Sequence, residues 1–129
     1  MIKLNRIHHT AIICSDYEKT KMFYTEILGF KILNEQFRAE RNSYKLDLIL
    51  NEQYQLEIFS FIDPPKRTSG PEACGLRHIA FEVENIEECV KILNQKGVYT
   101  EALRTDILTS KRFTFFADPD DLPIELYEK

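Results

Sequence analysis

One short pattern occurs twice in this chain, and it constrains the fold more than any other feature. A histidine opens a β-prone run at His9 and again at His78, and a glutamate follows each of them, Glu57 after 48 residues and Glu125 after 47. The two histidines are 69 positions apart and the two glutamates are 68 apart. A nearly constant offset indicates an internal duplication, so we expect two copies of one structural module.

The first half of the chain has the pattern of a βαβββ module. A β-prone run within 4–14 ends at Ser15, which is followed three residues later by Glu18, a pair typical of a helical capping box. Gly29 would end that helix in the left-handed conformation. Three further strands are then expected, at 30–38, 43–50 and 54–61.

The second half repeats the same order. After a strand at 76–84, Asn85 and Glu88 form a second capping box, and Gly97 would end the helix. Strands are expected at 99–104, 111–117 and 122–128. The predicted fold class is therefore α+β, with two tandem βαβββ modules whose strands form a curved, mostly antiparallel sheet.

The segment 63–75 contains three prolines and two glycines and breaks all periodicity, so we expect a surface connection there. It separates a first module at about 1–62 from a second at about 76–129. A module of about 60 residues buries too little apolar surface to be stable alone. We therefore predict one domain over 1–129.

Alternation along the strands predicts which side chains share a face. His78, Ala80 and Glu82 alternate with three apolar residues, which a helix would cover. Glu57 and Glu125 likewise alternate with apolar neighbours. In the first strand both faces are apolar, so alternation decides nothing there. His9 is preferred to its neighbour His8 because that choice aligns Ala11 with Ala80.

Two imidazoles and two carboxylates form a ligand set that suits a divalent first-row metal ion: Ni, Co or Zn in first place, Mn or Fe in second. Taken singly, a strand His or Glu is more often structural or solvated. The matched His–Glu pairs favour a metal site. Four ligands on an octahedral ion leave two positions for adjacent substrate oxygens, where an enediolate formed by proton loss would be stabilised. A glutamate released from the ion could move that proton.

Composition narrows the choice of partners and compartment. The net charge of -4 argues against a nucleic-acid surface. No stretch approaches the ~20 apolar residues of a membrane span, and the start lacks a secretory signal, so we expect a cytoplasmic protein. The three cysteines are expected to be reduced thiols. Two basic groups could still bind a small anion: Arg38, Arg41 and Lys45, or Lys111 and Arg112.

Several motifs together resemble the vicinal oxygen chelate superfamily and, within it, glyoxalase I. They are His9-Thr-Ala-Ile-Ile, Phe23-Tyr-Thr-Glu-Ile-Leu-Gly-Phe30, Leu56-Glu-Ile, Arg77-His-Ile-Ala-Phe and Phe116-Ala-Asp-Pro-Asp-Asp-Leu-Pro-Ile-Glu-Leu126. The resemblance covers essentially the whole chain. It implies modules that curl into a cup around a metal ion held by His9, Glu57, His78 and Glu125.

The same resemblance implies a reaction, the isomerisation of the hemithioacetal of methylglyoxal and a thiol to a 2-hydroxyacyl thioester. Glu125 is the first choice for the proton shuttle and Glu57 the second, while Arg112 would hold an anionic part of the substrate. A homodimer is also implied. Two departures stand out: Asp121 occupies the usual glycine position of the Asp-Pro-Asp-Gly turn, and no motif is typical of a glutathione site.

Other members of the superfamily provide the alternatives. Extradiol Fe(II) dioxygenases and fosfomycin-type thiol transferases typically keep two His and one Glu, and bleomycin-binding members lack the metal site. The full His/Glu/His/Glu set resembles glyoxalase I. A dioxygenase, a thiol transferase and a non-catalytic binding protein remain the competing hypotheses.

Overall fold

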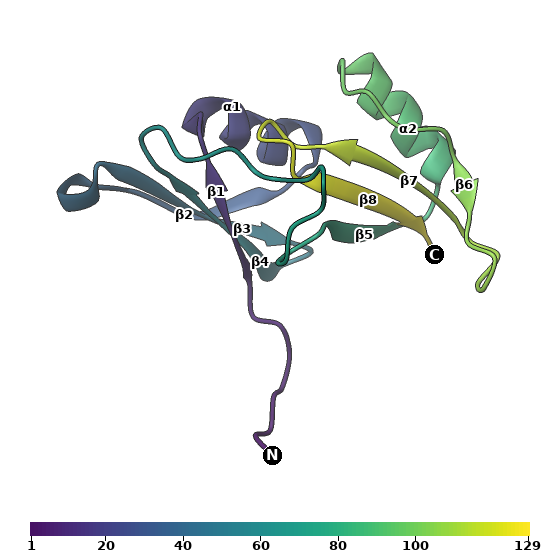
Figure 1. The fold of residues 1–129 in the computed structure, drawn as a ribbon, viewed down its shortest axis with the longest axis horizontal. Coiled ribbons are helices and arrows are strands. Elements are labelled where there is room, and N and C mark those ends of the chain that lie inside the picture. Colours follow the sequence, from purple (N-terminus) through teal and green to yellow (C-terminus); the bar gives the residue numbers. More distant parts are fainter. The chain divides into compact units, whose positions relative to one another are not determined.

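The computed structural model describes all residues from 1 to 129, and the chain forms two compact units, Met1–Pro65 and Lys66–Lys129. Each unit is a four-stranded mixed sheet with its own helix (Figure 1). This confirms the predicted α+β class and the two βαβββ modules. That the two units make up one domain stays a prediction.

Unit 1 is built in the order βαβββ. Its elements are β1 (Thr10–Cys14), α1 (Tyr17–Met22), the π-helical turn η1 (Phe23–Ile27), β2 (Lys31–Arg38), the 3-10 turn η2 (Ala39–Arg41), β3 (Ser43–Leu50) and β4 (Gln53–Ser60). The strand order is β1-β4-β3-β2. The first and last strands pair in parallel, and the other two pairings are antiparallel.

Unit 2 repeats this topology. Its elements are β5 (Ile79–Val83), α2 (Ile86–Gln95), β6 (Arg104–Thr105), β7 (Arg112–Ala117) and β8 (Pro123–Glu128). The strand order is β5-β8-β7-β6, again with the first and last strands parallel. Between β4 and β5 no residue is helical or extended, as expected for the connection at 63–75.

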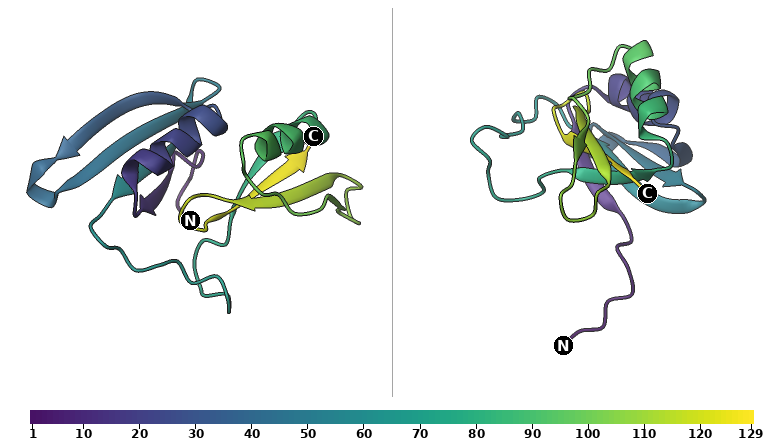
Figure 2. Two further views of the ribbon diagram at one scale, coloured as in Figure 1. Left: turned by 90° about the horizontal axis from the view of Figure 1, so that it is seen from above. Right: turned by 90° about the vertical axis from the view of Figure 1, so that its right-hand side faces the viewer.

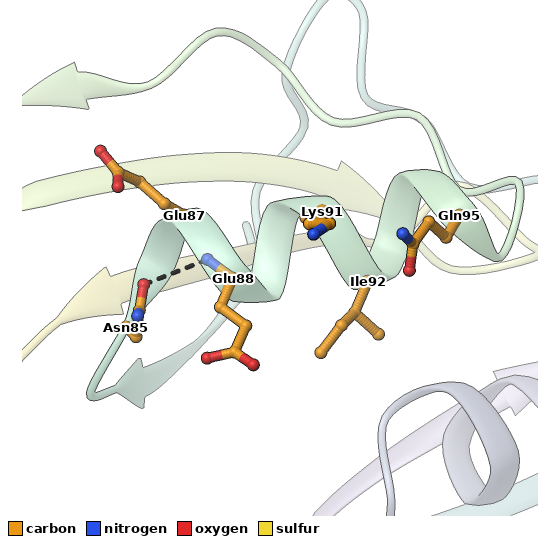
Figure 3. Close-up of a pocket in the computed structure, with 6 residues that line it drawn as sticks. All are labelled: Asn85, Glu87, Glu88, Lys91, Ile92 and Gln95. Carbon is orange, nitrogen blue, oxygen red and sulfur yellow. Dashed lines mark hydrogen bonds between the residues drawn. The ribbon is translucent and has the colours of Figure 1, made fainter.

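Side-chain caps fix where the two helices begin. Asn85 caps α2 by accepting a bond of 3.1 Å from the backbone N–H of Glu88, as predicted (Figure 3). In unit 1 the predicted cap, Ser15, is wrong by one residue. The helix starts at Tyr17, so the carboxylate of Asp16 is the group that reaches the Lys19 N–H, at 3.1 Å.

In each unit the helix covers one face of the sheet (Figure 2), and the core of that unit lies between its helix and its sheet. In unit 1 that face carries the fully buried Leu46, Leu48 and Ile58, and Tyr17 of α1 stacks on Tyr44 of β3 with ring centroids 4.1 Å apart. Each such aliphatic side chain contributes about 1.5–3 kcal/mol by leaving water. We call the opposite face of each sheet its open face.

The equivalent core of unit 2 is formed by β8 and α2. Ile124 and Ile86 are fully buried, and Leu93 and Leu126 are nearly so. Along β5 the apolar residues are half-buried while Ala80 and Glu82 are exposed, which agrees with the predicted alternation. Gly97 ends the helical segment at φ 79°, as Gly29 does in unit 1 at φ 83°.

Three predicted strands are clearly shorter in the structure, and the one expected at 76–84 covers only Ile79–Val83. The first begins only at Thr10, because its pairing with β4 starts there, opposite Leu56. The strand expected at 99–104 is reduced to Arg104–Thr105. The segment before it forms isolated hydrogen bonds instead, among them one of 2.9 Å from the Glu101 N–H to the Phe115 carbonyl.

The helices of both units are too short and too polar to span a membrane.

Candidate metal centre

In unit 1 the structure brings His9 and Glu57 together. His9 immediately precedes β1, and Ala11, two residues later, is paired with Glu57 on β4. Residues two apart on an extended segment face the same side, so His9 lies over the glutamate. Nε2 of His9 is 3.7 Å from Oε2 of Glu57, whose side chain is only 14% exposed.

Unit 2 contains the same arrangement. His78 immediately precedes β5, and Ala80 is paired with Glu125 on β8. Nε2 of His78 lies 3.1 Å from Oε2 of Glu125. Ala11 and Ala80 therefore have the equivalent register that their alignment in the sequence predicted.

Each pair offers one imidazole nitrogen and one carboxylate oxygen on an open sheet face. This donor chemistry fits a divalent first-row metal ion better than Mg²⁺ or Ca²⁺, which prefer oxygen alone. Two donors do not complete a metal site. The structure has no cluster of three or more His, Cys, Asp or Glu side chains arranged to hold a metal ion.

The carboxylate of Glu57 has several polar neighbours. The Tyr54 hydroxyl donates to it at 2.5 Å, and Nζ of Lys45 lies 3.5 Å away. Asp47 joins the same network, since it accepts from Lys45 at 2.7 Å and from Tyr54 at 3.0 Å. Burial, followed by the hydrogen bonds to Glu57 and Asp47, raises the pKa of Tyr54 above its usual range, so its hydroxyl remains a donor.

The environment of Glu125 is different. Its cross-strand neighbour on β7 is Phe115, whose ring meets the His78 imidazole edge-on with centroids 5.1 Å apart. Within unit 2, His78 is the one polar side chain in contact with the Glu125 carboxylate. The two glutamates are thus topologically equivalent but chemically distinct.

Three residues in the network, Tyr54, Lys45 and Asp47, were not singled out in the sequence as site residues. Strict alternation along β4 would place Tyr54 with Leu56 on the covered face. A bulge at Gln55 reverses this, because Leu48 pairs with Leu56 whereas the next residue, Ile49, pairs with Tyr54. Lys45 was considered only as part of a basic group. Lys45 and Asp47 are two residues apart on one strand, and this spacing could have predicted that their side chains share a face.

Arg112 lies on the covered face of unit 2. Its guanidinium binds Glu128 through two bonds of 3.0 and 2.6 Å, and Glu87 of α2 through one of 2.6 Å. The hydrogen bond from Arg112 is the main cause of a lowered pKa at Glu128. The carboxylates of Glu128 and Glu87 thus occupy the donors of Arg112 that would bind an anion. Arg112 is also on the face of the sheet opposite to that of Glu125. This gives Arg112 a structural role.

His8 is in contact with the first pair but not with Glu57. Its Nδ1 lies 2.7 Å from Nδ1 of His9, and its ring meets the Tyr54 ring edge-on at 5.2 Å. Tyr54 also lies against His9, with centroids 5.1 Å apart. His8 and Tyr54 together therefore hold the orientation of the His9 ring.

A shallow hollow lies over α2 (Figure 3). All of its lining residues come from the helix and its cap: Asn85, Glu87, Glu88, Lys91, Ile92 and Gln95. They are mostly charged or amide side chains on the solvent side of an amphipathic helix. We assign no site to this hollow.

Comparison with known proteins identifies the family. The model of the glyoxalase/bleomycin resistance protein/dioxygenase superfamily matches residues 6–126. The chain belongs to this superfamily. The match includes both His–Glu pairs and all the strands except the last two residues of β8.

Within the superfamily, two close relatives match over nearly the full length. The uncharacterized protein YwkD of Bacillus subtilis (strain 168) is 60% identical, with 98% of each chain covered. The crystal structure of the glyoxalase family protein from Enterococcus faecalis has a TM-score of 0.89 and 55% identity, and the match covers 95% of this chain and 97% of that one.

A more distant superfamily relative has a named activity. The lactoylglutathione lyase of Escherichia coli O157:H7 is 30% identical, and the match covers 96% of this chain and 93% of the lyase. Superfamily members typically use a divalent metal and bind small molecules.

Proposed function

We propose that the protein is a metal-dependent lyase or isomerase of the glyoxalase I type. It would act on a hemithioacetal or a similar small substrate that chelates through two oxygens. One observation carries the proposal: in both units the same strand register places an imidazole nitrogen beside a carboxylate oxygen, at 3.7 and 3.1 Å. The 30% identity with a lactoylglutathione lyase over nearly full length supports it.

His9, Glu57, His78 and Glu125 are the proposed ligands of one divalent ion, with Ni, Co or Zn favoured. When bound, the ion would supply a Lewis acid for adjacent substrate oxygens. The two pairs that share it would come from one chain or from both chains of a homodimer. The proposal includes a cytoplasmic location.

The proton transfer is assigned to Glu125. Its carboxylate has His78 as its one polar neighbour, so it can turn toward substrate without breaking other bonds. Phe115, its cross-strand neighbour, limits the access of water to the carboxylate, whose side chain is only 14% exposed. The Glu57 carboxylate is held by Tyr54 and Lys45 and is suited to stay in place.

The decisive test measures metal content and turnover in the same samples. Elemental analysis of the purified protein should find a divalent first-row ion, and removal of that ion should abolish isomerisation of the methylglyoxal hemithioacetal. His78→Ala should lower both metal content and turnover. Tyr99→Phe, at an exposed position away from both pairs, serves as the control and should retain the metal. A protein that binds no divalent ion, or is equally active without it, would refute the proposal.

Several thiols should be compared in this assay, since the sequence has no motif for glutathione. Turnover with any one of them supports the lyase. Oxygen consumption with a catechol substrate, dependent on Fe(II), would instead indicate a dioxygenase. Tight binding of a planar ligand that His78→Ala leaves unchanged would indicate a non-catalytic binding protein.

A further inference from the structure

We propose that Arg38 binds a carboxylate group of a small molecule on the open face of unit 1. The inference deepens the proposed function, because it specifies that the substrate is an organic acid. To that extent the inference rests on the proposed function. The carboxylate site itself is argued from unit 1 alone.

Arg38 is the last residue of β2, and its guanidinium carbon lies over the Phe59 ring, 4.7 Å from the ring centroid. Nη2 donates to the Ser43 hydroxyl at 2.9 Å. Nε is buried and has no hydrogen-bond partner. Stacking on Phe59 and the bond to Ser43 hold the guanidinium in place and leave the rest of its donor edge unused.

No carboxylate lies within ion-pair distance of Arg38, although the side chain is half-buried. Other arginines near the sheets have one. Arg104, which lies over aromatic rings in unit 2 in the same manner, is paired with Glu101 at 2.9 Å, and Arg112 is paired with Glu128. A half-buried cation without a counter-ion is costly, and a bound anion would remove that cost.

The register places Arg38 on the face that carries Glu57. Phe59 follows Glu57 by two residues on β4, so both side chains are on the open face, roughly 7 Å apart along the strand. Lys45 is directly opposite Phe59, but Asp47 and Glu57 already neutralise its charge. Arg38 is therefore the cation of this face that is available to a ligand.

The chemistry of the face favours a carboxylate group over a phosphate group. The planar guanidinium edge matches the two oxygens of a carboxylate. A phosphate group places two charges at one point, so Asp47 and Glu57, which lie on the same face, would repel it more strongly than a carboxylate group. A short acid could thus place its carboxylate at Arg38 while the rest of the molecule extends toward Glu57.

The test uses succinate as the probe and its neutral diamide, succinamide, as the chemical control. The full chain, freed of metal by a chelator, is titrated with each compound, and the backbone amide shifts of residues 36–45 and 57–60 are followed by NMR. We expect wild-type protein to bind succinate in preference to succinamide. Arg38→Gln should weaken succinate binding about tenfold or more, as loss of a charge-assisted hydrogen bond implies.

Two variants make the result specific. Arg38→Lys should retain part of the affinity, because it keeps the charge but not the planar donor edge. Arg41→Gln removes an exposed arginine from the same hairpin and should bind succinate as the wild type does. Circular dichroism and the urea midpoint of each variant establish whether it is folded. If Arg38→Gln does not fold, the succinate affinity of Arg38→Lys is compared with that of the wild type instead.

The proposal would be overturned by an Arg38→Gln variant with unchanged succinate affinity, by equal binding of succinamide, or by no binding of succinate to the wild type. Turnover gives an independent arm. With hemithioacetals of 3-mercaptopropionate and 2-mercaptoethanol, Arg38→Gln should raise KM for the acidic substrate alone. If the enzyme proposal fails, no thiol supports turnover, yet succinate binding and its loss in Arg38→Gln persist.

Discussion

Asp47 and Phe115 occupy the same position in the two modules, since each is the cross-strand neighbour of its module's glutamate. In unit 1 that neighbour belongs to a hydrogen-bonded network around Glu57, whereas in unit 2 it is an aromatic ring beside Glu125. A duplicated frame has thus diverged at the position that controls how firmly each carboxylate is held. This difference is the basis of the first two predictions.

Glu125→Gln should lower kcat by about 10²–10⁴ while KM changes little, because the amide can still coordinate weakly but cannot accept a proton. Kinetics must be expressed per bound metal ion, determined by elemental analysis of the same sample. Glu57→Gln is the matched comparison, and it should lower kcat per bound metal ion less than Glu125→Gln does. Equal losses in the two variants would contradict the assignment of the proton shuttle to Glu125.

Tyr54→Phe should weaken metal affinity about 10–100-fold, the usual cost of removing a group that orients a ligand. The variant deletes the hydroxyl that donates to Glu57 at 2.5 Å and leaves the ring against His9. Competition titration with a chromogenic chelator measures the change. Tyr99→Phe, at an exposed position, should bind metal normally. A Tyr54→Phe protein with wild-type affinity would show that the network does not support the ligand.

Asp121→Gly should stabilise the protein by about 0.5–1 kcal/mol. Asp121 has φ 66°, a left-handed conformation that glycine adopts without the steric cost of a Cβ. The turn itself is held by the Asp118 carboxylate, which accepts from the backbone N–H groups of Asp120 and Leu122. Urea denaturation gives the comparison. Asp120→Gly, one position earlier, should be destabilising, and stabilisation by both changes would argue against relief of strain at Asp121.

Glu35 should make stability depend on acid pH. Hydrogen bonds from Lys21 and then Tyr17 lower the pKa of the Glu35 carboxyl below its ordinary value of 4.5. A lowered folded-state pKa means that this contribution is complete above pH 4.5 and is lost as the pH falls through the folded value. Glu35→Gln should therefore cost stability at neutral pH, by about 0.2–1 kcal/mol for a partly exposed pair.

Urea midpoints of the wild type and of Glu35→Gln, measured from pH 7 downward, check this dependence. The difference between them should stay constant to about pH 4.5 and shrink below it. Glu40→Gln, which removes an exposed carboxylate of the η2 turn, should follow the wild-type curve. A gap between wild type and Glu35→Gln that is independent of pH would contradict the prediction.

Much of the fold could be predicted because local signals and topology agree. The strand at 43–50 has the predicted bounds, and the cap at Asn85 and the left-handed Gly29 and Gly97 are where the patterns placed them. The constant offset between the halves was sufficient to predict that the second module repeats the first. These features depend on short stretches of sequence, which a single chain displays directly.

The misses depend on interactions between distant segments. Residues before Thr10 have β propensity but no strand to pair with, so the first strand is shorter than predicted. The bulge at Gln55, which turns Tyr54 toward Glu57, comes from the β3–β4 register and leaves no local signal. Arg112 has the right residue type for an anion, yet its position in β7 directs it to Glu87 on α2.

The parallel pairing of first and last strands has a consequence for how such a protein can arise. In each module the histidine and the glutamate are at opposite ends of the segment, and only their pairing in β1–β4 or β5–β8 makes them neighbours. A fragment that ends before its fourth strand contains one member of the His–Glu pair and cannot form the contact. A module that keeps the pair must therefore be whole, and truncation within either module is expected to remove it.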